Sequence, residues 1–171
     1  YAGCWPPVPM PRGSPPSKIL ILPSRPSSRP VLLDDRTLVA LLVGEDIPIG
    51  RSPVRFTTSY FYFRACRAVV MGAGRHLSAP FERLDPEHRS TALEGLLALP
   101  DEVGLPDPRS LVPRMVEVQR RHPHLNVLNT EATAAALLLN ARVVLSSANA
   151  AGQLGAALPA EGVAFQTVEL P

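Results

Sequence analysis

One stretch sets the architecture of this chain: Val31-Leu32-Leu33-Asp34-Asp35-Arg36-Thr37-Leu38-Val39-Ala40-Leu41-Leu42. Its first three residues form a short apolar run, which favours a buried strand. Leu38, Leu41 and Leu42 then recur at helical spacing and predict the apolar face of a helix. Asp34 or Asp35 therefore lies where the strand gives way to the helix.

An aspartate in this position has two interpretations. Its carboxylate can cap the helix, because it accepts hydrogen bonds from free N–H groups of the first turn and suits the positive end of the helix dipole. Open α/β sheets also bind their ligands at this place, beyond the carboxyl ends of the strands. Capping is the commoner role, since helix caps far outnumber binding sites.

Length and composition bound the class of protein. The chain has 171 residues, of which 46% are hydrophobic and 19% charged, so it predicts about one folded domain with a substantial core. Its net charge of +2 neither indicates nor excludes a nucleic-acid partner. No apolar run reaches the roughly 18–20 residues that cross a bilayer. Cys4 and Cys66 form neither a metal-spaced pair nor a disulfide framework, so we expect a soluble, cytoplasmic protein with no membrane partner.

The first thirty residues differ from the rest in composition. Residues 1–30 hold nine of the twenty prolines, and proline removes backbone donors and fixes φ. We therefore expect a flexible Pro/Ser-rich tail over 1–30 and an α/β domain over 31–171. The chain opens with Tyr1, so the true start could be Met10, or the sequence could be incomplete at this end.

The middle of the chain reads mainly as helix. Residues 45–53 predict a loop, and Thr57 to Val70 then predicts a helix with a threonine or serine cap. Asp85-Pro86 and Asp107-Pro108 are typical of helix starts, because an acid caps the first turn and proline fits it. Residues 101–108 predict a loop or a short strand. The sequence His122-Pro123-His124 is more consistent with a helix end than with a metal pair.

The last third alternates helices with strands. The predicted elements are a helix from Glu131 to Leu139 capped by Asn129-Thr130, a strand over Arg142 to Leu145, a loop over Ser146 to Asn149, a short helix over Gln153 to Leu158, and a strand over Val163 to Val168. Such alternation with short loops favours a parallel sheet. We predict a three-layer α/β fold with helices on both faces of that sheet.

Polar residues follow several of these predicted strands. In a parallel sheet they converge, and the available set is Asp34, Asp35, Glu131, Ser147 and Asn149. Gathered carboxylates repel one another unless a hard divalent cation neutralises them, and Mg²⁺ or Mn²⁺ suits such oxygen ligands. A metal of this kind activates water and stabilises the transition state of phosphodiester hydrolysis.

With these motifs the chain resembles the PIN domain family, small α/β metal-dependent ribonucleases that include many bacterial toxins. The family opens with a strand ending in Asp and an apolar helix, which Leu33-Asp34-Asp35-Arg36-Thr37-Leu38-Val39-Ala40 fits. An acid starting an alanine-rich helix is matched by Glu131-Ala132-Thr133-Ala134-Ala135-Ala136. The family next has a strand followed by Thr-x-Asp and a short helix, which Val143-Val144-Leu145-Ser146-Ser147-Ala148-Asn149 matches in shape, with Ser147 for Thr and Asn149 for Asp. The resemblance covers residues 31–168.

The resemblance implies an RNA-cleaving enzyme with one Mg²⁺ or Mn²⁺ ion. Asp34 and Glu131 would bind the metal, with Asp35 as a further ligand. Ser147 and Asn149 would orient water or phosphate. Members of the family often form homodimers or bind antitoxins, so the resemblance also implies RNA, an antitoxin or a second copy as partners.

The chain departs from the family pattern at two acids. The family usually has an acid near the middle of the second helix, but no carboxylate lies between Asp46 and Glu82. Asn149 is neutral as well, so two of the four usual acids are missing. Arg64 would repel a cation if it pointed inward.

Two alternatives to the ribonuclease therefore stay open. In the first, a PIN-like domain binds RNA or a partner protein without cutting it. Tyr60, Tyr62, Arg64 and Arg67 would carry that binding, because interleaved tyrosine and arginine can stack on bases and hold phosphates. Aromatic residues at this spacing are, however, more often part of a core. In the second alternative, the acids at the sheet edge are only helix caps.

Overall fold

The computed structural model of the chain describes residues 29–49, 54–72 and 75–170. Residues 1–28 of the expected tail lie outside the described residues, as do residues 50–53 of the expected loop. Residues 45–49 of that loop carry no helix or strand. None of the helices described is long and apolar enough to cross a membrane.

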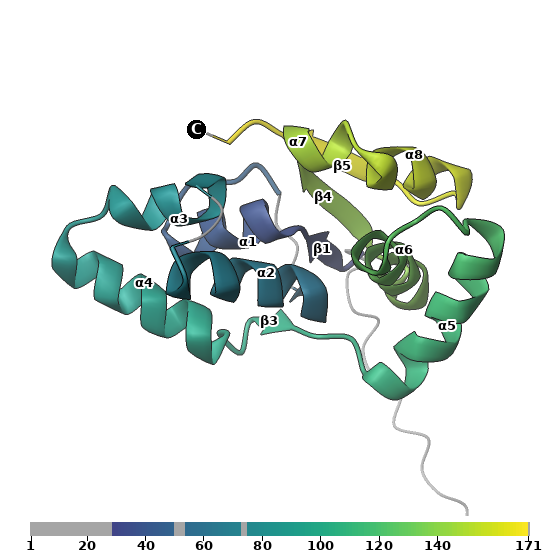
Figure 1. Cartoon of the computed structure of the whole chain (residues 1–171), viewed down its shortest axis with the longest axis horizontal. Coiled ribbons are helices and arrows are strands. Elements are labelled where there is room, and N and C mark those ends of the chain that lie inside the picture. The colour runs from purple at the N-terminus through teal and green to yellow at the C-terminus, as the bar shows by residue number, and fades with distance from the viewer. Residues whose placement is uncertain (1–28, 50–53, 73–74, 171) are drawn as a thin grey trace, which may run out of the picture.

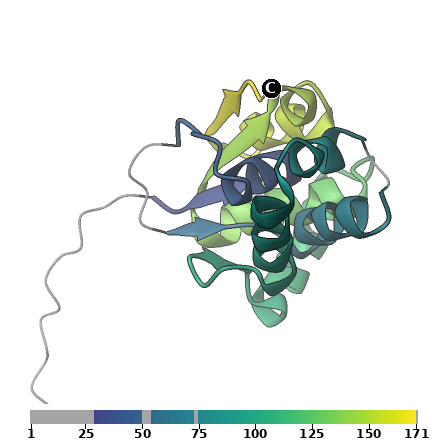
Figure 2. The ribbon, with the colours of Figure 1, turned by 90° about the vertical axis from the view of Figure 1, so that its left-hand side faces the viewer.

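The described chain is built on a five-stranded sheet in which every pairing is parallel, with the strand order β3-β2-β1-β4-β5. The strands are β1 (Val31–Leu33), β2 (Arg55–Phe56), β3 (Val103–Gly104), β4 (Arg142–Ser146) and β5 (Phe165–Val168). Figure 2 shows them side by side. The predicted strands are confirmed, and β2 is an addition that the sequence did not indicate.

Eight helices are described around this sheet (Figure 1). They are α1 (Asp35–Leu42), α2 (Ser59–Val70), α3 (Arg75–Glu82), α4 (Pro86–Ala98), α5 (Pro108–Arg121), α6 (Val127–Leu139), α7 (Ser147–Ala150) and α8 (Gln153–Ala160). Helices α1 to α4 gather at one end of the molecule, and α5, α6 and α8 lie at the other end (Figure 1). The predicted α/β class is confirmed.

The alternation of side chains along the strands explains why helices cover both faces. Leu32 and Val143 point into a core shared with α5, α6 and α8. Val31, Leu33 and Val144 point the other way, toward Ala40 of α1 and the segment that follows it. A third cluster joins α1 to α2, α3 and α4. Both faces of the sheet are therefore buried, as a parallel sheet requires.

Side-chain caps fix where most of these helices begin. The Asp85 and Asp107 carboxylates accept hydrogen bonds from amides of the first turns of α4 and α5. A proline is the first residue of each helix, as predicted. The Thr58 hydroxyl caps α2 by accepting from the amide of Phe61 at 3.2 Å. At the end of α5, His122 lies 2.8 Å from a carboxylate oxygen of Glu161, which agrees with the predicted polar helix end.

Two predictions about the last third were wrong. Helix α6 begins at Val127 and its cap is Asn126, which accepts from the amide of Asn129 at 2.9 Å, so Asn129-Thr130 lies inside the helix. The predicted loop over Ser146 to Asn149 is instead the last residue of β4 followed by the short helix α7. In both places several residues that can cap a helix follow one another. The spacing of the apolar residues alone does not show which of them is the N-cap.

Candidate functional site

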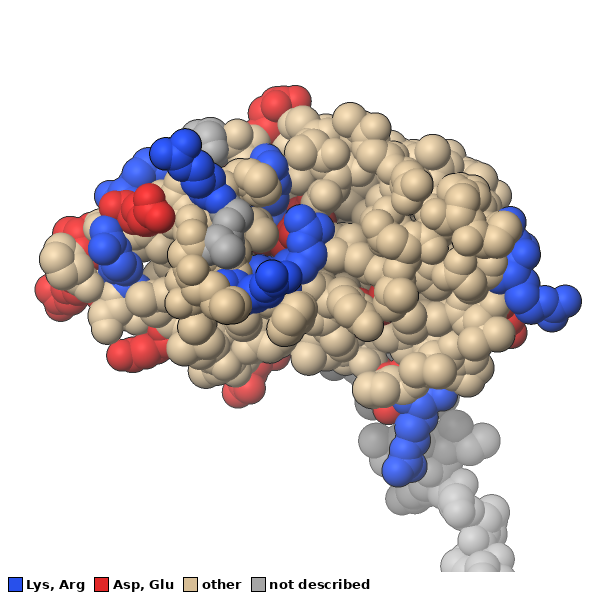
Figure 3. All heavy atoms as spheres, in the orientation of Figure 1, with Lys and Arg blue, Asp and Glu red and all other residues tan. Residues whose placement is uncertain are grey.

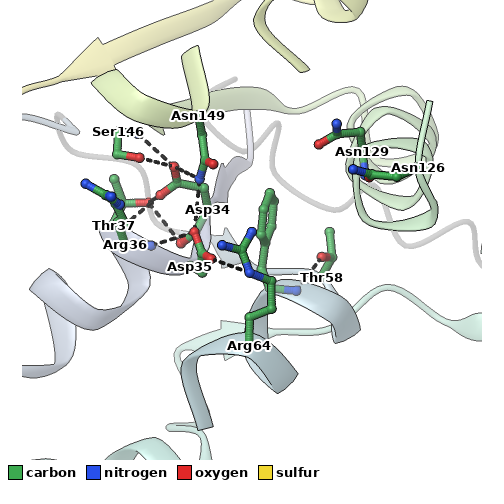
Figure 4. Close-up of polar contacts among 11 residues, drawn as sticks. Asp34, Asp35, Arg36, Thr37, Thr58, Arg64, Asn126, Asn129, Ser146 and Asn149 are labelled. Atoms are coloured by element: carbon green, nitrogen blue, oxygen red, sulfur yellow. Dashed lines mark hydrogen bonds and ion pairs between the residues drawn. The ribbon is translucent and has the colours of Figure 1, made fainter. Parts of the chain in front are cut away.

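Asp34 lies at the end of β1, and its side chain is fully buried. Its Oδ1 accepts from the amide and the hydroxyl of Thr37, at 2.8 and 2.7 Å. Its Oδ2 accepts from the amide and the hydroxyl of Ser146, both at 2.8 Å, and from the side-chain amide of Asn149 at 2.7 Å (Figure 4). Both oxygens are thus occupied by donors, and Asp34 caps α1 while tying β1 to the end of β4.

Asp35 is equally buried but less well satisfied. Its Oδ1 accepts from Asn149 at 2.9 Å and from the amide of Arg36 at 3.0 Å. Its Oδ2 has no hydrogen bond and lies 3.2 Å from Nε of Arg64, in an ion pair whose geometry is not that of a hydrogen bond. Burial raises the pKa of this carboxyl, and the negative charge of Asp34 raises it further; Arg64 and Asn149 act in the opposite direction.

Asn149 bridges the two aspartates. It is carried by α7, and its one amide nitrogen donates to Oδ2 of Asp34 and to Oδ1 of Asp35. The two carboxylates determine how this amide is oriented, because the reversed amide would set its oxygen against them. Asn149 thus supplies donors at a point where a third carboxylate would add negative charge.

Arg64 reaches this acid pair from α2 (Figure 4). Its side chain remains 41% exposed while its Nε faces Asp35, so it spans the distance from the buried acids to solvent. Arg64 therefore points inward, in the orientation that would repel a cation. A guanidinium in this position offsets part of the negative charge of Asp34 and Asp35.

Glu131 is buried but turns to a different partner. Its two carboxylate oxygens accept from the amides of Ser59 at 3.2 Å and of Tyr60 at 2.9 Å, the first residues of α2. A carboxylate in this place binds free N–H groups and the positive end of the helix dipole. Glu131 therefore fastens α6 to the start of α2.

The two serines at the end of β4 divide their contacts. Ser146 contacts Asp34, whereas the hydroxyl of Ser147 donates to the carbonyl of Val168 at 3.2 Å, on the neighbouring strand β5. The structure thus brings together Asp34, Asp35 and Asn149 among the predicted catalytic and metal-binding residues. Ser146 and Thr37 complete that group and were not predicted; an N-cap aspartate commonly accepts from the amide three residues on, and that rule could have indicated the contact between Asp34 and Thr37.

The predicted RNA-binding residues lie on α2. Tyr60 and Arg67 are exposed there, and Arg64 falls between them at helical spacing, so the three share one face. Phe63, 57% exposed, lies on the same side and was not predicted. Tyr62 points elsewhere, because its hydroxyl donates to the carbonyl of Leu97 in α4 at 2.8 Å. We call the residues Tyr60, Phe63, Arg64 and Arg67 the α2 face.

The residues around the acid pair do not fit a divalent cation in this arrangement. Mg²⁺ and Mn²⁺ prefer oxygen ligands, but the carboxylates of Asp34 and Asp35 face N–H and O–H donors and a guanidinium. Within the described ranges no group of three or more His, Cys, Asp and Glu side chains is placed to hold a metal ion. Glu131, the third predicted ligand, is bound to α2.

Comparisons with known proteins add no assignment to this geometry, since neither a family model nor a curated protein matches the chain.

Proposed function

We propose that this chain is a PIN-like domain that binds single-stranded RNA through the α2 face and does not cleave it. One observation carries the proposal: exposed aromatic and arginine side chains share a helix face directly beside an acid pair whose oxygens already have protein donors. In this role the acids Asp34 and Asp35 hold the sheet edge together and position Arg64.

The chemistry of the α2 face suits a single strand. Bases stack on Tyr60 and Phe63, and each such contact contributes about 1–3 kcal/mol with little sequence preference. Arg67 is exposed and has no ion pair with another residue that the structure describes, so its guanidinium is free to bind a phosphate. Arg64 uses Nε toward Asp35, and its terminal nitrogens remain available.

The wider surface supports the same partner. Basic and acidic side chains both lie over the end of the molecule that carries α1 to α4, and Figure 3 shows basic side chains grouped around the α2 region. RNA is proposed over other polyanions because the motifs resemble those of the PIN family, whose members act on RNA.

The test is binding of a fluorescent single-stranded RNA with a 5′-hydroxyl end, measured by anisotropy in the presence of EDTA. The Tyr60→Ala/Arg67→Gln variant should bind at least about tenfold more weakly, since it loses a stacking contact and a charged phosphate contact. Arg109→Gln, an exposed arginine at the start of α5, serves as the control and should bind as the natural chain does. Equal affinity of all three proteins would contradict the proposal.

The ribonuclease hypothesis makes a different forecast for the same RNA. It requires cleavage that starts when Mn²⁺ replaces EDTA and that Asp34→Asn abolishes. Our proposal expects the RNA to remain intact under both conditions. Metal-dependent cleavage lost in Asp34→Asn would overturn the non-cleaving part of the proposal.

A partner protein is the second candidate for this surface. Val70 and Met71, at the C-terminal end of α2, are 67% and 70% exposed. They extend the α2 face with apolar side chains, and exposed apolar surface suits a protein partner more than a nucleic acid. Substitution of both residues by serine separates the two candidates. It should leave RNA affinity unchanged if RNA is the ligand.

A further inference from the structure

A groove with a volume of about 80 Å³ lies between α1 and α3. It is lined by Arg36 and Ala40 of α1, by His76 and Ala79 of α3, and by Arg83, which directly follows α3. One water molecule needs about 10–15 Å³ by this kind of measure, so the groove has room for several waters or for one small oxyanion.

Small side chains create this space. Ala40, 2% exposed, forms part of the floor, and Ala79 faces it from α3. Helix α3 buries Leu77 and Phe81 in the core on its other side, and Pro80 and Leu170 supply the remaining apolar lining of the groove. Of the two arginines in the lining, Arg36 is half-buried and Arg83 is exposed.

The charged side chains that line the groove favour an anion. Two guanidinium groups, Arg36 and Arg83, and the carboxylate of Glu45 line the groove, which gives a net charge of about +1 before any proton on His76 is counted. Arg36 forms no ion pair with the part of the chain that the structure describes. Nε of Arg83 makes one long contact, 3.4 Å to the carbonyl of Ala79, so its terminal nitrogens are free to bind a ligand.

We propose that this groove binds a phosphate group, with Arg36 and Arg83 as the residues that hold it. Guanidinium groups bind phosphate oxygens through paired, charge-assisted hydrogen bonds, and two of them that line one groove can bind a tetrahedral anion together. The site is separate from the acid pair, since the main-chain amide of Arg36 contacts Asp35 while its side chain lines the groove. It does not require that the α2 face bind RNA.

The experiment is a titration of inorganic phosphate into the isotope-labelled full chain, followed by amide NMR shifts. We expect saturable shifts at Ala40 and Ala79 in the groove. Arg36→Gln/Arg83→Gln should weaken the binding at least tenfold, because both charge-assisted contacts are lost. Ala79→Leu should weaken it as well by filling the groove while both arginines remain. Arg109→Gln on α5 should change nothing.

Two outcomes would overturn the proposal. One is shifts that do not saturate with phosphate. The other is equal binding by the natural chain and by both groove variants, each shown by its amide spectrum to be folded. Neither outcome bears on RNA binding by the α2 face, which is measured with a 5′-hydroxyl RNA, so the two proposals fail separately.

A second arm identifies the source of the phosphate. If the groove receives the end of an RNA strand, a 5′-phosphorylated oligonucleotide will bind more tightly than its 5′-hydroxyl form, and the groove variants will lose that preference. If the groove receives a small phosphorylated molecule, inorganic phosphate will bind and the two oligonucleotides will not differ. Either result supports a phosphate site.

Discussion

The side-chain nitrogen of Asn149 lies 2.7 Å from Oδ2 of Asp34, although 115 residues separate them in the sequence. The same nitrogen reaches Asp35 at 2.9 Å. A neutral amide therefore binds two adjacent carboxylates at the carboxyl-terminal ends of β1 and β4. An acid in the place of Asn149 would repel both carboxylates unless a cation neutralised them. The identity of one side chain decides the charge balance of this site.

Replacement of Asn149 by aspartate should reverse that balance. Asn149→Asp puts a third carboxylate beside Asp34 and Asp35, and we expect it to lower the free energy of unfolding by about 1–3 kcal/mol in EDTA. Mn²⁺ should restore part of the loss, which thermal unfolding with and without the metal will measure. Asn149→Ala, which removes the donor and adds no charge, should show no such restoration. A Mn²⁺-dependent rise in the Tm of the natural chain, lost in Asp34→Asn, would show instead that the native residues already bind metal.

Glu131 should contribute to stability through its contact with α2. In Glu131→Gln an amide NH₂ replaces one acceptor oxygen and faces a backbone N–H, so we expect a loss of about 1–3 kcal/mol in the free energy of unfolding. Urea denaturation followed by circular dichroism measures this loss. Glu102→Gln, at an exposed position, is the control and should unfold like the natural chain. An unchanged midpoint in Glu131→Gln would argue against the capping role.

Asp35 should make stability fall as the pH rises. Its folded-state pKa is raised above the ordinary 3.8, chiefly by burial, so the folded state binds this proton more tightly than the unfolded state does. Between those two pKa values the free energy of unfolding decreases with pH through this group. Asp35→Asn should therefore be more stable than the natural chain at pH 7. This advantage should vanish below about pH 3.8, where the Asp35 carboxyl is protonated in both the folded and the unfolded state of the natural chain. The check is Tm against pH for both proteins. A variant that is less stable at pH 7 would mean that the ion pair with Arg64 outweighs burial.

Gly155 should tolerate no side chain. A Cβ at this position of α8 would lie 1.8 Å from the carbonyl oxygen of Ala150 in α7, so one helix would have to move. We expect Gly155→Ala to cost about 1–3 kcal/mol or more, as overpacking does. Because α7 carries Asn149, the side-chain amide signal of Asn149 should shift as well.

Gly95 offers a matched comparison for that substitution. It lies inside α4, where an added Cβ would meet no atom within 4 Å. Gly95→Ala should raise the free energy of unfolding by about 0.5–1 kcal/mol, since alanine favours the helix. Similar effects at Gly95 and Gly155 would contradict the close packing of α7 against α8.

Local pattern was enough to predict much of the fold. The apolar run before Asp34 and the helical spacing after it predicted β1 and α1, and Asp85 and Asp107 predicted the starts of two further helices. These signals are contained within a few neighbouring residues. β2, with only Arg55 and Phe56, is too short to carry a period of its own.

The site was predicted less completely because its contacts join residues that are far apart in the sequence. Glu131 finds its partners in Ser59 and Tyr60, more than seventy residues earlier, and no spacing rule reports that contact. Whether Ser146 or Ser147 faces Asp34 depends on how β4 ends and α7 begins. The direction in which Arg64 points likewise depends on how α2 packs against α1.

The bridge formed by Asn149 also affects how this site can change during evolution. Codons for asparagine and aspartate differ at a single base, so the neutral donor and a third acid are one nucleotide substitution apart. A lineage that carries this sheet edge can therefore exchange a self-contained hydrogen-bond network for a cluster of three acids in a single mutational step, without altering any strand or helix that frames it.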